Sequence, residues 1–102
     1  MKIEWAYGEG PTTLGGLADE VEREGRLVVG SLIDGNGERC LWGVLENVER
    51  SGRACRTLDF ALRVYLMHNG LNPSDNNSFA GTPEERCQEM VRRMRKLDIE
   101  AP

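Results

Sequence analysis

The stretch from Thr82 to Leu97 constrains this chain most, because both its start and its buried face are legible in the sequence. The Thr82 hydroxyl can accept a hydrogen bond from the N–H of Glu85, whose carboxylate can reach back and close a capping box. Pro83 fits the first helical position, where its missing N–H costs nothing. An apolar stripe with helical spacing follows, formed by Cys87, Met90, Val91, Met94 and Leu97. We therefore predict a helix here that packs on other helices, with a frayed tail from Asp98 onwards.

A second helix is predicted from an N-cap at Thr12 or Thr13 to about Glu24, with Gly25 as its stop. Its core face is expected to comprise Leu14, Leu17, Ala18 and Val21. The glycine pair at 15–16 weakens the first turn by roughly 1 kcal/mol per residue relative to alanine. The pair indicates either a close approach by another element or a frayed first turn.

Two further helices are predicted in the middle of the chain, one from about Cys40 to Arg50 and one from Arg56 or Thr57 to His68. Their core faces are expected to comprise Leu41, Val44, Leu45 and Val48 in the first, and Leu58, Ala61, Leu62, Tyr65 and Leu66 in the second. A strand that continues through Leu45 is the alternative for the first of them.

Two short segments have the pattern of β-strands. Residues 1–7 alternate, with Ile3, Trp5 and Tyr7 on one side, and residues 27–33 are rich in β-branched and aliphatic side chains. Asp-Gly and Asn-Gly dipeptides follow at 34–37 and favour a hairpin that returns through 38–40. With 102 residues, the chain is expected to be one domain, 1–102. The predicted class is α+β, mainly α: four helices with a short β-hairpin and an N-terminal strand that can lie beside it.

The composition excludes several classes of protein. Apolar residues make up 39% and charged residues 29%, which is ordinary for a soluble domain. No apolar run approaches the roughly 20 residues of a membrane span, and the N-terminus lacks a signal-peptide pattern, so a cytoplasmic protein without a membrane partner is expected. Three cysteines lie far apart, at 40, 55 and 87, with one histidine and no C-x-x-C. We expect reduced structural thiols, and neither a metal site nor a cofactor.

The charge is distributed unevenly. Residues 1–50 hold ten acids and five bases, net −5, and residues 51–102 hold seven acids and eight bases, net +1. This polarity is too weak for a nucleic-acid footprint. The basic residues of the last helix fan out around its axis and favour a solvated face: Arg86, Arg92, Arg93, Arg95 and Lys96. A weak nucleic-acid binder that uses this helix stays open as an alternative.

Cys40 and His68 are the candidates for catalysis. A thiol at a helix N-terminus is favoured as thiolate, and Arg39 acts in the same direction. A cysteine-dependent hydrolase would use His68 as base, with Asn69 or Asp75 to orient it. The alternative is a buried structural cysteine, and a histidine that simply interacts with the dipole at the end of its helix.

Two polar surfaces are candidates for binding. One is the acidic outside of the first helix, formed by Asp19, Glu20, Glu22 and Glu24. The other is the loop Asp75, Asn76, Asn77 and Ser78, whose residues favour Asx turns and an exposed recognition surface.

Two stretches, 39–45 (Arg-Cys-Leu-Trp-Gly-Val-Leu) and 75–85, carry a resemblance over roughly residues 26–97. The chain resembles short, uncharacterised, mostly helical proteins of bacteriophages and actinobacteria with the pattern C-x-x-G-A-L, an N-D pair and T-x-E-E. Val44 replaces the alanine of that pattern, and Asn76-Asn77 replaces its N-D pair.

The resemblance implies a mostly helical fold and a phage setting, and it brings no activity. We therefore expect a non-catalytic accessory protein, monomeric or homodimeric, that binds a protein partner and inhibits a host defence protein. Exposure of Trp5 or Trp42 would favour a protein interface.

Overall fold

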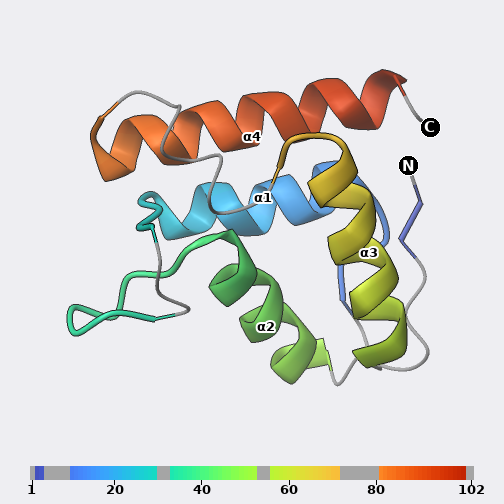
Figure 1. The fold of residues 1–102 in the computed structure, drawn as a ribbon, viewed down its shortest axis with the longest axis horizontal. Coiled ribbons are helices and arrows are strands. Elements are labelled where there is room, and N and C mark those ends of the chain that lie inside the picture. Colours follow the sequence, from blue (N-terminus) through green and yellow to red (C-terminus); the bar gives the residue numbers. More distant parts are fainter. Residues whose placement is uncertain (1, 4–9, 30–32, 53–55, 72–80, 101–102) are drawn as a thin grey trace.

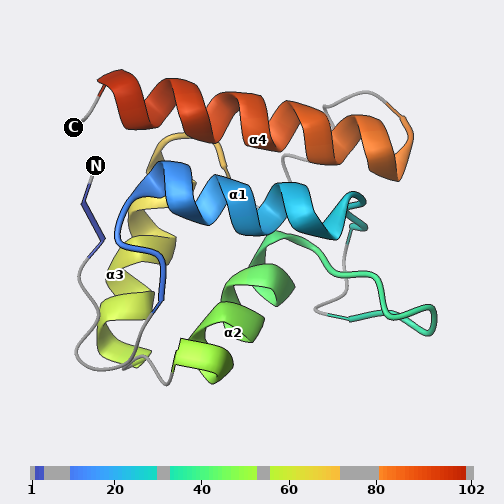
Figure 2. The ribbon, with the colours of Figure 1, turned by 180° about the vertical axis from the view of Figure 1, so that it is seen from behind.

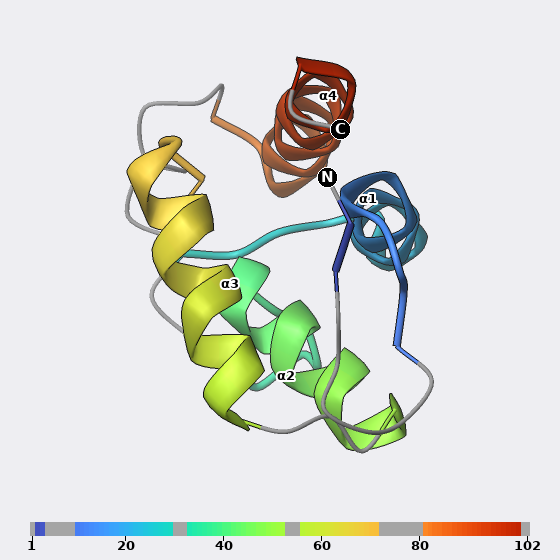
Figure 3. The same cartoon turned by 90° about the vertical axis from the view of Figure 1, so that its right-hand side faces the viewer.

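The computed structural model describes residues 2–3, 10–29, 33–52, 56–71 and 81–100, and for residues 51–52 and 56–59 the helical backbone alone. The described fold is mainly helical, as predicted, with α1 (Leu14–Glu24), α2 (Leu41–Gly52), α3 (Arg56–His68) and α4 (Pro83–Glu100). α1 and α4 lie side by side and run antiparallel, as Figures 1 and 2 show. α2 and α3 form a second layer across them, which is seen in Figure 3 with α1 and α4 almost end-on.

The predicted helix caps are confirmed. The Thr13 hydroxyl accepts from the N–H of Gly16 at 3.0 Å, and Gly25 ends α1 in the left-handed region with φ 76°. At the start of α4, the Thr82 hydroxyl accepts from the N–H of Glu85 at 3.1 Å. It also donates to the Glu85 carboxylate at 2.8 Å, so this carboxylate binds the Thr82 hydroxyl and not the Thr82 N–H expected in a capping box. These local bonds satisfy N–H groups that the helix itself leaves unpaired, which is why the helix starts could be read from sequence.

The end of α4 differs from the prediction. The helix continues to Glu100, so the expected fraying from Asp98 is wrong for residues 98–100. The physical reason is tertiary: the Asp98 carboxylate accepts hydrogen bonds from the backbone N–H groups of Leu14 and Gly15 at the start of α1. A carboxylate is stabilised at the N-terminus of a helix, so this contact holds the last turn of α4 in place.

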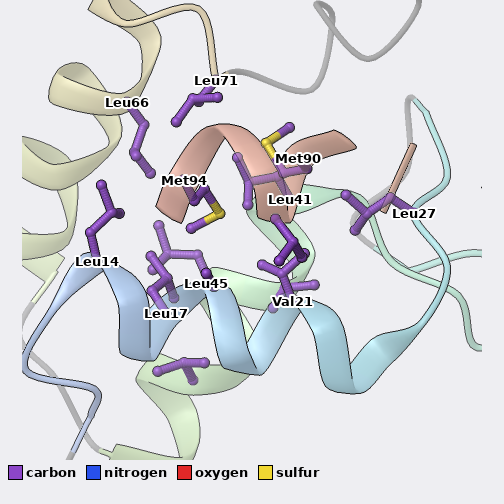
Figure 4. Close-up of a cluster of buried hydrophobic side chains, with 14 of the residues drawn as sticks. Leu14, Leu17, Val21, Leu27, Leu41, Leu45, Leu66, Leu71, Met90 and Met94 are labelled. Atoms are coloured by element: carbon purple, nitrogen blue, oxygen red, sulfur yellow. The ribbon is translucent and has the colours of Figure 1, made fainter. Parts of the chain in front are cut away.

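One hydrophobic core joins the four helices (Figure 4). The predicted core residues of α1, α2 and α4 are confirmed, with Leu97 half-buried against them. The core also takes in residues outside the helices, namely Ile3, Leu27 and Leu71. In α3, Leu62 and Leu66 are buried, but the prediction for Ala61 is wrong, because its side chain is exposed. The side chain of Leu58, also predicted to be in the core, lies outside the described residues.

α2 is helical from Leu41 onward, so the alternative of a strand through Leu45 is wrong. Trp42 lies beside the core rather than in it, half-buried. The Arg63 guanidinium of α3 lies 5.3 Å from the centroid of the Trp42 ring and pairs with Glu49 at 3.5 Å. This cation–π contact and ion pair link α3 to α2.

The predicted strands are not confirmed. Within the described residues the only β-type pairings are two isolated bridges, Lys2 with Thr13 (antiparallel) and Leu27 with Arg39 (parallel). The Asp34 carboxylate accepts from the N–H groups of Asn36 and Glu38, both at 2.9 Å, and closes the predicted turn. Residues 4–9, including Trp5, and residues 30–32 lie outside the described part of the chain, so the hairpin and the N-terminal strand stay predictions.

Candidate functional site

The acidic residues predicted on the outside of α1 lie at the surface, but each is paired within the molecule. Asp19 and Glu22 both contact Arg95 of α4, at 2.9 and 3.2 Å. Glu20 pairs with Arg23 at 3.1 Å, and Glu24 pairs with Arg39 at 3.2 Å. The four carboxylates are therefore partly neutralised before any partner arrives. The second predicted surface, Asp75, Asn76, Asn77 and Ser78, lies outside the described residues.

Cys40 lies directly before α2 and is 3% exposed. Its carbonyl accepts the N–H of Val44 at 3.0 Å, which starts the helix as predicted. His68 is exposed at the end of α3, and the Asn69 amide donates to the carbonyl of Tyr65 at 2.9 Å. Among the described residues, no hydrogen bond joins Cys40 to His68. A thiol this deeply buried meets a substrate only after local opening of the fold.

The basic residues in the second half of α4 are also paired. Arg92 and Arg93 both donate to Glu89, with shortest distances of 2.6 and 2.9 Å, and Lys96 lies 3.9 Å from Glu100. Hydrogen bonds from Arg92 and then from Arg93 lower the pKa of Glu89 to about 2. Arg95 reaches across to α1, whereas Arg92 and Arg93 bind a carboxylate of their own helix.

An exposed apolar face on α3 was not predicted from the sequence. Phe60, Val64 and Met67 are 68%, 36% and 51% exposed. Their spacing of i, i+4 and i+7 aligns them on one side of the helix, opposite the buried Leu62 and Leu66. The sequence contains the signal for this face. A helix that packs on one core needs apolar residues on one side only, whereas α3 has them on two sides. We call Phe60, Val64 and Met67 the outer face of α3.

Two grooves open on the described surface. One, of about 220 Å³, follows α2 and is lined by Ile33, Arg39, Gly43, Glu46, Asn47 and Arg50. The other, of about 330 Å³, lies between the end of α3 and the last turns of α4, and we call it the α3–α4 groove. It is lined by Asn69, Leu71, Arg92, Arg93, Lys96, Leu97 and Glu100.

Metal-binding groups and membrane-spanning helices are two further features that can be assessed over the described residues. Three or more His, Cys, Asp or Glu side chains do not come together there in a group that could hold a metal ion. None of the described helices is long and apolar enough to cross a bilayer.

Comparison with protein-family models, with curated proteins and with solved structures finds no match to this chain.

Proposed function

We propose that this protein binds another protein through the outer face of α3. The observation that carries the proposal is the exposure of three large apolar side chains, Phe60, Val64 and Met67, along one side of a single helix. Contiguous exposed apolar side chains mark interaction sites in soluble proteins more often than scattered ones do. The mode that fits is a helix that presents anchors at i, i+4 and i+7 to the apolar surface of a partner.

The energetics support such a face as an interface. Fully burying a side chain of this size stabilises a complex by about 1.5–3 kcal/mol relative to leaving it in water. α3 is held from behind by Leu62, Leu66 and the contacts of Arg63, so its backbone is ordered before binding. A preformed helix loses little conformational entropy on association, which leaves more of that energy for affinity.

The alternatives have less support. A hydrolase at Cys40 needs an accessible thiol, and this one is 3% exposed. A nucleic-acid binder needs clustered cations, whereas Arg95 pairs with α1 and Arg92 and Arg93 share Glu89. The paired carboxylates of α1 make the predicted acidic surface a weaker candidate than α3. The resemblance to phage proteins makes an inhibited host protein the first partner class to test, and that extension rests on the resemblance alone.

The test is a selection of peptides from a random display library on the wild-type protein, followed by affinity measurements on purified variants. Phe60→Glu and Met67→Glu should each weaken the selected peptides at least tenfold, because a charge would be buried in the interface. Ile33→Glu is the matched control. Ile33 is also an exposed apolar residue, 57% exposed, and its loop lies at the opposite end of the molecule from α3 (Figure 1).

Retained binding in Ile33→Glu, with unchanged melting temperatures in all three variants, would support the proposal. Peptides that bind Phe60→Glu as tightly as wild type would place the binding surface elsewhere. A selection that enriches no peptide at all would also reject it.

A further inference from the structure

The outer face of α3 ends two residues before the first residue that lines the α3–α4 groove. From Phe60 to Met67 the face rises by roughly 10 Å along the helix, at about 1.5 Å per residue. Asn69, two residues after Met67, already lines the groove. Figure 3 shows this end of α3 rising towards α4, whose cations form the other wall. A segment lying along α3 would therefore meet the groove with one of its ends.

The groove is the more positive part of an acidic protein. Its wall contains Arg92, Arg93 and Lys96, against Glu100 in the wall and Glu89 beside it, which gives three positive and two negative charges among the residues that the structure describes. The chain as a whole has a net charge of −4. The side chains of Arg92 and Lys96 are 61% and 66% exposed, so both can reach a second carboxylate.

The end of α3 does not cancel this charge. The last carbonyls of a helix carry partial negative charge, which would attract cations. Here the carbonyl of Tyr65 accepts from the Asn69 amide, that of Leu66 from the N–H of Leu71, and that of Met67 from the N–H of Gly70. With these acceptors satisfied, the α4 cations dominate the groove.

The groove lies just beyond the end of the outer face, and it contains more cations than carboxylates among the described residues. We therefore infer that the partner of the outer face is an amphipathic helix with carboxylates at the end that lies over the α3–α4 groove. The inference rests on the proposed function, and it adds the partner's chemistry and polarity. Its apolar residues would cover Phe60, Val64 and Met67, and its carboxylates would pair with Arg92 and Lys96.

The probes are three synthetic helical peptides with leucines at i, i+3, i+4 and i+7. One carries three glutamates at its amino end, one carries them at its carboxyl end, and one carries glutamines at both ends. We expect one acidic peptide to bind about fivefold tighter than the neutral peptide at low salt, from two exposed charge pairs. The preference should shrink as salt is raised.

Two sets of variants separate the contribution of the groove cations to peptide affinity from that of the apolar face. Arg92→Gln with Lys96→Gln should abolish the preference while leaving the affinity for the neutral peptide unchanged. Arg23→Gln with Arg50→Gln is the matched control, because both are exposed arginines paired with glutamates three or four residues earlier. Phe60→Glu should remove binding of all three peptides.

Three outcomes would overturn the inference. Equal binding of the three peptides, lost in Phe60→Glu, would refute the acidic end and leave the proposed function intact. If none of the three peptides binds, the inference about the acidic end is also refuted. In that case the display selection tests the proposed function independently. Self-association of the wild type by sedimentation, abolished in Phe60→Glu, would show that a second copy of this chain covers the face.

Discussion

The carboxylate of Asp98, in the last turn of α4, lies 3.0 Å from the position that a Cβ on Gly15 would occupy. The same carboxylate accepts the backbone N–H of Gly15 at the start of α1. A Cβ at position 15 would therefore crowd the Asp98 carboxylate, which would have to shift to make room. Of the two readings of the glycine pair at 15–16, the structure supports the close approach.

Asp98 and Gly15 should be energetically coupled. Asp98→Ala is expected to cost about 1 kcal/mol, because α1 loses an anion and an acceptor at its N-terminus. Gly15→Ala should gain up to about 1 kcal/mol in the Asp98→Ala background, the usual helix preference for alanine. In the wild type it should gain less or destabilise, since its Cβ displaces the carboxylate. Urea denaturation of the four proteins measures the coupling, and additive effects would contradict it.

Acid should destabilise the protein through Glu89. Its folded-state pKa of about 2 lies below the ordinary value of 4.5, because Arg92 and then Arg93 donate to the ionised form. The stabilisation is thus complete above pH 4.5 and is lost as the pH falls from 4.5 towards 2. Glu89→Gln should cost about 1 kcal/mol at pH 7, from two helix-surface pairs of roughly 0.5 kcal/mol each.

The measurement is urea denaturation of wild type and Glu89→Gln between pH 7 and pH 2. The stability difference should narrow below pH 4.5 and become small as the pH falls through 2. Glu100→Gln is the control, because its partner Lys96 lies 3.9 Å away and the pair is exposed. Parallel curves for wild type and Glu89→Gln across this range would refute the role of Glu89.

Ala61 and Leu62 are neighbours in sequence with opposite surroundings. Leu62→Ala should destabilise by about 3 kcal/mol, because it leaves a cavity in the core. Ala61→Glu should change stability by no more than about 0.5 kcal/mol, as at an ordinary exposed helical position. Thermal and urea unfolding of both variants check this. A large loss of stability in Ala61→Glu would mean that Ala61 faces the core, as predicted from the sequence.

Cys40 should be unreactive in the folded protein. It is 3% exposed, as is Cys87, whose thiol donates to the Val21 carbonyl at 3.2 Å. Both thiols should react with iodoacetamide only as fast as the fold opens, and equally slowly, when followed by site-resolved mass spectrometry. Rapid modification of Cys40 near pH 6.5, with Cys87 still protected, would revive the cysteine-hydrolase alternative.

The elements that could be predicted are those that depend on local bonds and periodicity. Thr13, Gly25 and Thr82 act within one turn of their own helix, so their roles follow from neighbouring residues. The core stripes of α1, α2 and α4 are legible because each helix has one apolar side. The β-pairing was harder to predict from the sequence, since Leu27 pairs with Arg39 in a parallel bridge that no local turn rule specifies.

Four helices, their caps and most of the buried side chains could be predicted from the sequence, because they follow from contacts three or four residues apart. The predicted burial of Leu62 and Leu66 in α3 is confirmed. How far the core reaches around that helix was set by the tertiary structure, which leaves Ala61, Phe60, Val64 and Met67 exposed. The tertiary structure alone paired Asp19 and Glu22 with Arg95, and placed Asp98 against Gly15. These relationships join residues that are distant along the chain, so no periodicity within one helix could specify them.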